Sequence, residues 1–221
     1  MAFVAYDRPV RAAIIGLGRI YDLNILAYVG NPDVEVVALV DPSEERRAER
    51  QADWPQAPVF ASAAELAASG IGVDAVEALL PVPLHVDGVI ELLSYGWHVN
   101  LQKPMCNDLA GAQQILDAAQ AHDRVLRVME NYLFYEPLRK LKEVAESGDL
   151  GTIAGYHMKM VGSGSGGWHV PWSSFEWQLE QMKRGRGILV FDDGWHKLAT
   201  ALWLFGPVNE VRAWIGTTSF G

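Results

Sequence analysis

The chain has little cysteine and little positive charge. Its 221 residues include one cysteine, Cys106, so an internal disulfide is excluded and a reducing, cytoplasmic location is expected. The chain has 18 Lys and Arg residues and 27 Asp and Glu residues, which gives a formal net charge of −9. Because no basic cluster is present to neutralise phosphates, neither nucleic acid nor an anionic membrane is expected as a partner.

Long hydrophobic runs are also missing, and no leader segment is expected. The apolar stretch 198–205 is typical of the longest and falls well short of the roughly 18 residues that span a bilayer. The first seven residues carry no basic region, so we expect no signal peptide. Four of the histidines, His85, His98, His122 and His157, have no metal-ligand spacing, and no metal site is expected.

The chain does contain an alternation of strand and helix patterns over its first 130 residues. Apolar strands are predicted at 10–15, 34–40, 75–80, 97–101 and 124–129, and helices at 20–30, from an N-cap at Ser43, at 83–95 and at 108–122. Strands that are apolar throughout are typical of a parallel sheet covered on both faces. We therefore predict a doubly wound α/β domain over residues 1–130.

The pattern changes in residues 131–221. A helix is predicted at 135–147, strands at 153–161 and 208–215, and a helix at 189–205 after a tryptophan-rich loop. These elements are the beginning of an α+β domain, but two strands are too few for an independently stable sheet. At about 150 residues per domain, the length also corresponds to one domain and a half.

Glycines follow the first strand, where a dinucleotide-binding turn belongs. Gly16 suits the tight turn and Gly18 would let the backbone approach a pyrophosphate, while Arg19 and Ile20 open the next helix. Tyr21 occupies the position of the usual third glycine. This bulky residue implies either a wider spacing between helix and strand or a ring turned toward solvent or ligand.

An acid after the second strand strengthens the nucleotide interpretation. Asp41 lies where a carboxylate would bind the hydroxyls of the adenosine ribose. The same charge would repel a 2′-phosphate, so NAD is favoured over NADP, although Arg46 and Arg47 keep NADP open. The alternative is that Asp41 and Pro42 form an ordinary turn.

Four further stretches carry a resemblance to a known family. They are 78–85 with Pro81 and His85, 96–104 with Lys103 and Pro104, 131–151, and 187–196 with Asp192, Gly194 and His196. Together with the glycine turn, they are similar over residues 10–218 to the glucose–fructose oxidoreductase and inositol dehydrogenase (Gfo/Idh/MocA) proteins. The resemblance implies an N-terminal Rossmann domain that binds a nicotinamide cofactor. It also implies a C-terminal substrate domain with a mostly antiparallel sheet.

The resemblance also implies roles for individual residues. The cofactor-binding residues would be Gly16, Gly18, Arg19, Ile20, Asp41, Pro81, His85 and Lys103. His196 would be the base that takes a hydroxyl proton, Lys103 its electrostatic and proton-relay partner, and Asp192 the acid that orients the imidazole. Taken singly, Asp192 also fits a helix N-cap, His196 a core histidine and Lys103 a solvated loop lysine.

Aromatic residues are candidates for substrate contact. Six of the eight tryptophans lie between residues 168 and 214. Aromatic faces suit the C–H faces of sugar rings, so Tyr132, Trp168, Trp172 and Trp195 are the candidate substrate-binding residues. An equal alternative is that the tryptophans only fill the junction between the domains.

The function expected from these features is hydride transfer. We expect an NAD-dependent oxidoreductase acting on a carbohydrate, polyol or related hydroxylated ring. An NAD-dependent glycoside hydrolase of the same family is one alternative. A non-catalytic cofactor-binding subunit is another, because the chain departs from the family pattern at Tyr21, Val82, Gln102, Phe134 and Ala199.

The length bears on assembly as well. Members of this family are typically half as long again or more, so the C-terminal domain is expected to be incomplete. Its sheet would then have unpaired edges and an uncovered apolar face. We therefore expect the chain to form a homo-oligomer through the C-terminal sheet.

Overall fold

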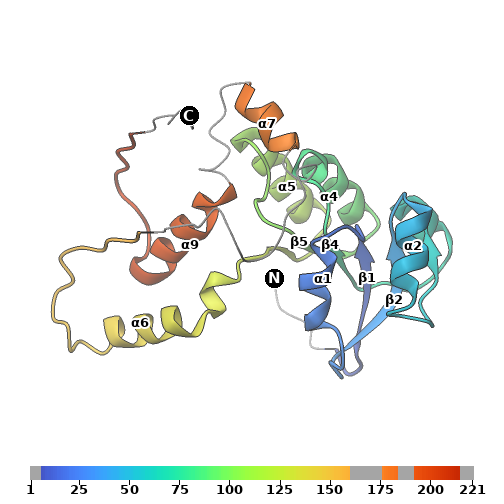
Figure 1. Cartoon of the computed structure of the whole chain (residues 1–221), viewed down its shortest axis with the longest axis horizontal. Helices are drawn as coiled ribbons and strands as arrows, with labels where there is room; N and C mark the ends of the chain where they lie inside the picture. The colour runs from blue at the N-terminus through green and yellow to red at the C-terminus, as the bar shows by residue number, and fades with distance from the viewer. Residues whose placement is uncertain (1–5, 160–175, 184–191, 215–221) are drawn as a thin grey trace. The chain divides into compact units, whose positions relative to one another are not determined.

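The structure is a computed structural model that describes residues 6–159, 176–183 and 192–214 (Figure 1). The chain forms two compact units, Met1–Met129 and Glu130–Gly221, which we call unit 1 and unit 2. Unit 1 contains a sheet with helices on both faces. The secondary structure of unit 2 is helical over its described residues.

Unit 1 is built on a six-stranded parallel sheet, as the apolar strand patterns predict. The strands have the spatial order β3-β2-β1-β4-β5-β6, and every neighbouring pair is parallel. Their bounds are β1 (Val10–Ile15), β2 (Val34–Val40), β3 (Val59–Phe60), β4 (Ala75–Ala78), β5 (His98–Leu101) and β6 (Leu126–Val128). The chain order reverses between β1 and β4, and ligands of such sheets bind at the carboxyl ends of the strands at this point.

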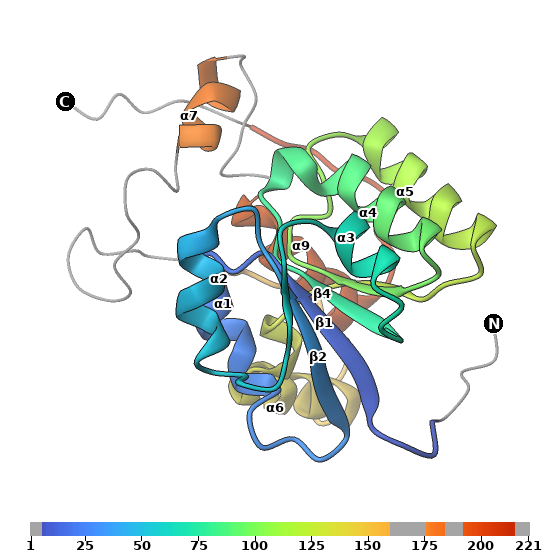
Figure 2. The same ribbon diagram turned by 90° about the vertical axis from the view of Figure 1, so that its right-hand side faces the viewer.

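Helices cover both faces of this sheet. Figure 2 shows α1 and α2 on one side of β1, β2 and β4, and α3, α4 and α5 on the other. Their bounds are α1 (Tyr21–Asn24), α2 (Glu44–Gln51), α3 (Ala63–Ala68), α4 (His85–Ser94) and α5 (Leu109–Ala121), with 3₁₀ turns η1 (Ile25–Ala27) and η2 (Val82–Leu84). The predicted N-cap of α2 is confirmed, because the Ser43 hydroxyl accepts the Arg46 N–H.

Alternate residues of the central strands supply two separate hydrophobic cores. Ala13 and Ile15 of β1 belong to the core on the α3–α5 side, which contains Leu66. Ile14, between them, belongs to the opposite core together with Tyr21. Successive side chains of a strand point to opposite faces of a sheet. A strand buried on both faces is therefore apolar throughout, as 10–15 is.

Tyr21 fills the core beneath the glycine turn. Its ring is buried, and its hydroxyl lies 3.0 Å from Asp53 Oδ2 and 3.1 Å from Trp54 Nε1. Burial, followed by the hydrogen bond to Asp53, raises the pKa of the phenol. The prediction of a ring turned toward solvent is therefore wrong: the ring packs under α1, and its hydroxyl contacts the loop after α2.

The secondary structure found among the described residues of unit 2 consists of helices. The 3₁₀ turn η3 (Tyr132–Phe134) leads into α6 (Glu136–Glu146), and α7 (Glu176–Lys183) and α9 (Gly194–Phe205) follow. α9 packs against η3. Lys142 connects α6 to the end of α9, since its Nζ donates a 2.8 Å hydrogen bond to the Trp203 carbonyl and lies 4.9 Å from the Trp203 ring centroid.

Two predictions for unit 2 are wrong. Over their described parts, 153–159 and 208–214, the predicted strands 153–161 and 208–215 are not formed. An alternating pattern forms a strand only when a neighbouring strand satisfies its backbone hydrogen bonds, and the described residues of unit 2 include none. Trp177, expected in a loop, lies in α7. The predicted helix 189–205 is confirmed from Gly194 to Phe205, while 189–191 lie outside the described residues.

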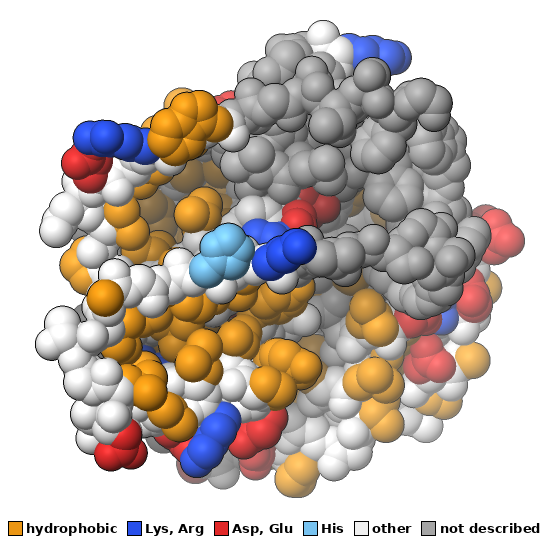
Figure 3. Space-filling model, turned by 60° about the vertical axis from the view of Figure 1, so that its left-hand side comes forward, with side chains coloured by type: hydrophobic (Ala, Val, Ile, Leu, Met, Phe, Trp, Pro, Cys, Tyr) orange, Lys and Arg blue, Asp and Glu red, His pale blue; other side chains and the backbone are white. Residues whose placement is uncertain are grey.

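Unit 2 exposes large hydrophobic side chains, and Figure 3 shows hydrophobic side chains gathered on one face. Leu198 and Leu202, one turn apart on α9, are 59% and 48% exposed, and Trp214 is 90% exposed. Monomeric proteins rarely leave extended apolar patches in water. These residues are thus candidates for contact with further protein. In the described ranges, no helix has the length and hydrophobicity needed to cross a membrane.

Candidate functional site

The glycine turn lies at the carboxyl end of β1 and has a backbone that only glycine tolerates at Gly16. Gly16 has a φ of +93°, and a Cβ at this position would lie 2.5 Å from the Leu79 carbonyl oxygen. The Gly16 N–H donates to the Val40 carbonyl at 2.8 Å, which holds the turn against the end of β2. Gly16 is therefore required by the protein's own packing.

Gly18 has a different reason to lack a side chain. A Cβ at Gly18 would have one neighbour within 4 Å, the flexible end of Arg46 at 3.6 Å, and its φ is not in the left-handed region. Neither packing nor backbone conformation in the chain therefore demands glycine. The space over Gly18 fits the close approach of a pyrophosphate to the backbone, with Arg19 and Ile20 following as the chain enters α1.

Asp41 joins the end of β2 to the glycine turn. Its carboxylate is buried and accepts two backbone N–H groups, from Leu17 at 2.8 Å and from Ser43 at 2.8 Å. Arg46 lies 3.8 Å from Asp41 Oδ2, and Arg47 donates to the Asp41 carbonyl at 2.6 Å. The carboxylate thus fixes the turn and places a negative charge beside Gly18.

Lys103 follows β5 at the same edge of the sheet. Lys103 is partly exposed, and its peptide bond to Pro104 is cis. Its backbone N–H donates to Gln102 Oε1 at 2.8 Å, so the Gln102 side chain contacts the backbone of Lys103. Pro81 lies exposed after β4, at the N-cap of η2.

His85 holds the backbone that follows Lys103. The ring is fully buried (0% exposed). Its Nδ1 lies 2.9 Å from the Pro104 carbonyl oxygen and 3.2 Å from that of Met105, and its Nε2 lies 2.8 Å from the Leu80 carbonyl oxygen. Burial lowers the pKa of the imidazole, against the opposing effect of these carbonyls. His85 therefore joins the end of β4 to the turn after Lys103.

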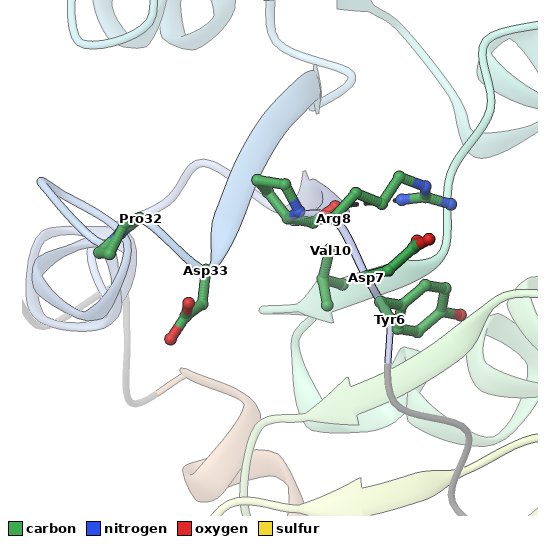
Figure 4. Close-up of a pocket in the computed structure, with 7 residues that line it drawn as sticks. Tyr6, Asp7, Arg8, Val10, Pro32 and Asp33 are labelled. Atoms are coloured by element: carbon green, nitrogen blue, oxygen red, sulfur yellow. Dashed lines mark hydrogen bonds between the residues drawn. The ribbon is translucent and has the colours of Figure 1, made fainter.

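A hollow of about 500 Å³ in unit 1 lies away from these residues. Figure 4 shows Tyr6, Asp7, Arg8 and Val10 along the start of β1, with Pro32 and Asp33 before β2. These are the amino ends of the strands, whereas ligands of parallel α/β sheets bind at the carboxyl ends. We therefore do not assign the cofactor to this hollow. In the described ranges, no group of three or more His, Cys, Asp or Glu residues could hold a metal ion.

Unit 2 places His196 against a carboxylate and an aromatic ring. His196 is buried in the first turns of α9, and its Nδ1 lies 2.8 Å and 3.0 Å from the two carboxylate oxygens of Glu130. The Tyr132 ring stacks on the imidazole with a centroid separation of 4.2 Å and an interplanar angle of 7°. The residue expected to contact substrate, Tyr132, thus supports the proposed base.

The other predicted residues of unit 2 are placed as follows. Asp192 precedes α9, whose N-cap is Asp193. Trp195 lies in α9, and its buried indole Nε1 has no hydrogen-bond acceptor among the described residues. Trp168 and Trp172 lie outside the described residues. The pattern did not indicate Glu130; an acid directly after the strand at 124–129 was the signal that could have done so.

Two family models match the chain. Residues 10–130 match the family model described as "Oxidoreductase family, NAD-binding Rossmann fold", and residues 138–220 match the "GFO/IDH/MocA C-terminal domain". The chain belongs to the GFO/IDH/MocA oxidoreductase family. This membership confirms the resemblance read from the motifs, and with it the nucleotide-binding class of unit 1.

The names of two curated relatives in this family refer to an inositol and to a nucleotide-linked sugar. The scyllo-inositol 2-dehydrogenase (NADP(+)) IolU of Bacillus subtilis is 29% identical over 61% of this chain and 40% of its own length. The dTDP-3,4-didehydro-2,6-dideoxy-alpha-D-glucose 3-reductase of Actinomadura kijaniata is 29% identical over 69% of this chain and 46% of its own length. The chain spans about half the length of the curated relatives it matches.

A solved structure supports the fold along most of the chain. The WlbA dehydrogenase from Bordetella pertussis, in complex with NADH and UDP-GlcNAcA, is 24% identical and has a TM-score of 0.73. The match covers 92% of this chain and 57% of that protein. The fold class is therefore confirmed: a Rossmann-type parallel sheet followed by a segment, 138–220, that matches the GFO/IDH/MocA C-terminal domain.

The two glycines of the turn make a matched pair of variants. Gly18→Ala should leave the free energy of unfolding within about 0.5 kcal/mol of wild type, because the new Cβ meets only ordinary contacts. The same variant should weaken NAD binding about tenfold or more, because the methyl group occupies the space for the pyrophosphate. Urea denaturation and calorimetric titration with NAD measure the two effects.

Gly16→Ala is the control and should do the opposite. It should destabilise unit 1 by about 3 kcal/mol or more, because the Cβ clashes with backbone at a positive φ. Wild-type NAD affinity in Gly18→Ala would show that no cofactor approaches Gly18.

Burial of His85 predicts a pH dependence of stability. Folding lowers the pKa of this imidazole. As the pH falls through the ordinary histidine pKa, the unfolded chain therefore binds more protons than the folded chain. Stability should therefore fall between pH 7.5 and 5.5, at no more than about 1.4 kcal/mol per pH unit for this group. His85→Gln should flatten the slope and also lose about 1–3 kcal/mol at pH 7.5, because carbonyl contacts are lost.

Urea denaturation at the two pH values measures this dependence, with His122→Gln, an exposed residue, as control. Part of the slope should remain in His85→Gln, because burial also lowers the pKa of His98. Equal slopes in wild type and His85→Gln would contradict the assignment.

Proposed function

We propose that the chain is the cofactor-binding and catalytic part of an NAD-dependent oxidoreductase. It would transfer a hydride between the nicotinamide and a carbohydrate, polyol or related hydroxylated ring. The observation that carries the proposal is the turn 16–18, in which Gly16 is explained by packing and Gly18 is explained by a ligand. Family membership and the curated relatives that act on inositol and on a nucleotide-linked sugar support it.

The chemistry divides between the cofactor and the chain. When bound, the nicotinamide supplies the acceptor or donor of the hydride. The chain's part is to hold the cofactor at Gly16, Gly18 and Asp41, and to take the hydroxyl proton of the substrate at His196. By resemblance, Lys103 would stabilise the developing charge on the substrate oxygen and relay its proton, and Asp192 would be a further acid of the catalytic set.

The remaining cofactor and substrate contacts follow from the same resemblance. Pro81 and the segment joined by His85 would flank the cofactor at the ends of β4 and β5, and Arg19 and Ile20 would contact its phosphates. Trp195 is proposed for the substrate: its indole N–H has no acceptor among the described residues, and a sugar hydroxyl would supply one. Trp168 and Trp172 are proposed as further aromatic contacts.

NAD rather than NADP is the proposed cofactor. The buried Asp41 carboxylate follows β2, and its negative charge would repel a 2′-phosphate on the adenosine ribose. Arg46, 3.8 Å from Asp41 Oδ2, offsets this charge in part, so NADP should still bind weakly. We expect NAD to bind at least about tenfold more tightly than NADP.

We also propose a cytoplasmic location and a homo-oligomer. One cysteine, buried and free, suits a reducing compartment. Exposed Leu198, Leu202 and Trp214 of unit 2 would supply the contact between copies. Sedimentation velocity should detect species larger than the 24.4 kDa chain, and a clean monomer at all concentrations would contradict the oligomer.

The central test is turnover by the purified chain. Given NAD and a panel of inositols, free sugars and nucleoside-diphosphate sugars, it should produce reduced cofactor, measured by its absorbance. His196→Ala should lower kcat by about 100-fold or more, because the base is lost, while NAD affinity stays within about twofold. His157→Ala, at an exposed position of the same unit, is the control and should retain activity.

The alternatives give different results in the same assay. Unchanged turnover in His196→Ala would remove this residue as the base. Release of free sugar from a glycoside without net reduction of NAD would favour the hydrolase instead. Tight NAD binding with no reaction on any compound would favour a non-catalytic subunit.

A further inference from the structure

Glu130 is a buried acid that no family motif of the chain assigns. It directly follows β6 and Met129, and it is 8% exposed. Both of its carboxylate oxygens lie within hydrogen-bond distance of His196 Nδ1, at 2.8 Å for Oε1 and 3.0 Å for Oε2. Oε1 also accepts the backbone N–H of Tyr132 at 2.8 Å. A buried carboxylate is costly unless it is hydrogen-bonded, and these contacts supply its partners.

We propose that Glu130 is the positioning residue that fixes the tautomer of His196. A carboxylate accepts hydrogen bonds but does not donate them, so Nδ1 must carry the hydrogen. A neutral imidazole has one N–H, which leaves Nε2 with a free lone pair. Nε2 is therefore the atom that takes the substrate's proton; this step rests on the proposed function, whereas the tautomer itself does not.

Neighbouring residues fix the plane of the His196 ring as well as the nitrogen that carries its hydrogen. Tyr132 covers one face of the imidazole at an interplanar angle of 7°. A half-turn of the ring about its Cβ–Cγ bond would break the Nδ1 contacts with Glu130, and a tilt of the ring out of its plane would break the stacking on Tyr132. The imidazole is consequently held in one orientation before any substrate binds, which is how a general base is made effective.

Glu130 fills the role that the sequence pattern gave to Asp192. Nδ1 has a single hydrogen to donate, and the two oxygens of Glu130 already share it. Asp192 is therefore not the acid that orients Nδ1. In the proton-transfer step, the O–H bond of the substrate breaks and an Nε2–H bond forms. The imidazolium that results is stabilised by the Glu130 carboxylate, which accepts the Nδ1–H hydrogen bond.

The isosteric variant Glu130→Gln makes a sharp test, because the Tyr132 N–H decides how the amide lies. That backbone donor requires the amide oxygen at the position of Oε1. The amide NH₂ then takes the position of Oε2, 3.0 Å from Nδ1, where it can donate to an unprotonated Nδ1 and repels a protonated one. The Nδ1–H tautomer therefore loses stabilisation, and a larger fraction of His196 carries its hydrogen on Nε2, without the lone pair needed for proton abstraction.

Nitrogen NMR of the chain labelled with ¹⁵N-histidine reads the tautomer directly, with His196→Gln used to assign the signal. In wild type, His196 should show a protonated Nδ1 and an unprotonated Nε2 at neutral pH. Glu130→Gln should raise the fraction of His196 protonated at Nε2, Glu130→Asp should keep the wild-type pattern, and Glu136→Gln, at an exposed acid on α6, should not change it. Thermal unfolding checks that each variant is folded.

Kinetics gives the second readout. On a substrate that wild type turns over, Glu130→Gln should lower kcat by about 10³–10⁴-fold with little change in NAD affinity, and Glu130→Asp should restore a large part of the loss. A wild-type His196 protonated at Nε2, or an unchanged tautomer in folded Glu130→Gln, overturns the proposal. The expected tautomers in a chain that turns over no substrate would support the role of Glu130 and count against the proposed function instead.

Discussion

The buried carboxylate of Asp41 is the contact on which the nucleotide edge of unit 1 depends. Without it, the N–H groups of Leu17 and Ser43 would be left without an acceptor in a largely buried place. The carboxylate ties the end of β2 to the turn after β1, while Gly16 allows that turn to approach Leu79 beyond β4. One acid thus decides both the geometry of the turn and the charge beside it.

Local sequence pattern predicted unit 1 well and unit 2 poorly, for a physical reason. A strand such as 10–15 is apolar because both its faces are buried, and Ser43 and Asp108 begin their helices through contacts three residues away. The segments 153–161 and 208–215 have strand-like sequences, but a local sequence pattern supplies no partner strand. β3 was missed because two residues carry no period.

One part of the candidate site could be predicted from the sequence and the other could not. The glycine turn and Asp41 could be predicted, because they follow two neighbouring strands, β1 and β2, at the same edge of the sheet. Glu130 and His196 are 66 positions apart, and no local pattern states that they touch. Tyr21 is a similar case: its pattern raised the question of where a bulky ring goes, and only the packing with Asp53 and Trp54 answers it.

The His85 ring lies between two backbone segments, the end of β4 and the turn after Lys103, and it has one N–H hydrogen to offer them. Carbonyl oxygens face both of its ring nitrogens, but a neutral imidazole has a hydrogen on only one. Each tautomer therefore holds one backbone segment and leaves the other facing a lone pair. The two backbone segments, at Leu80 and Pro104, compete for a single hydrogen, and its transfer from one ring nitrogen to the other would exchange which segment is hydrogen-bonded.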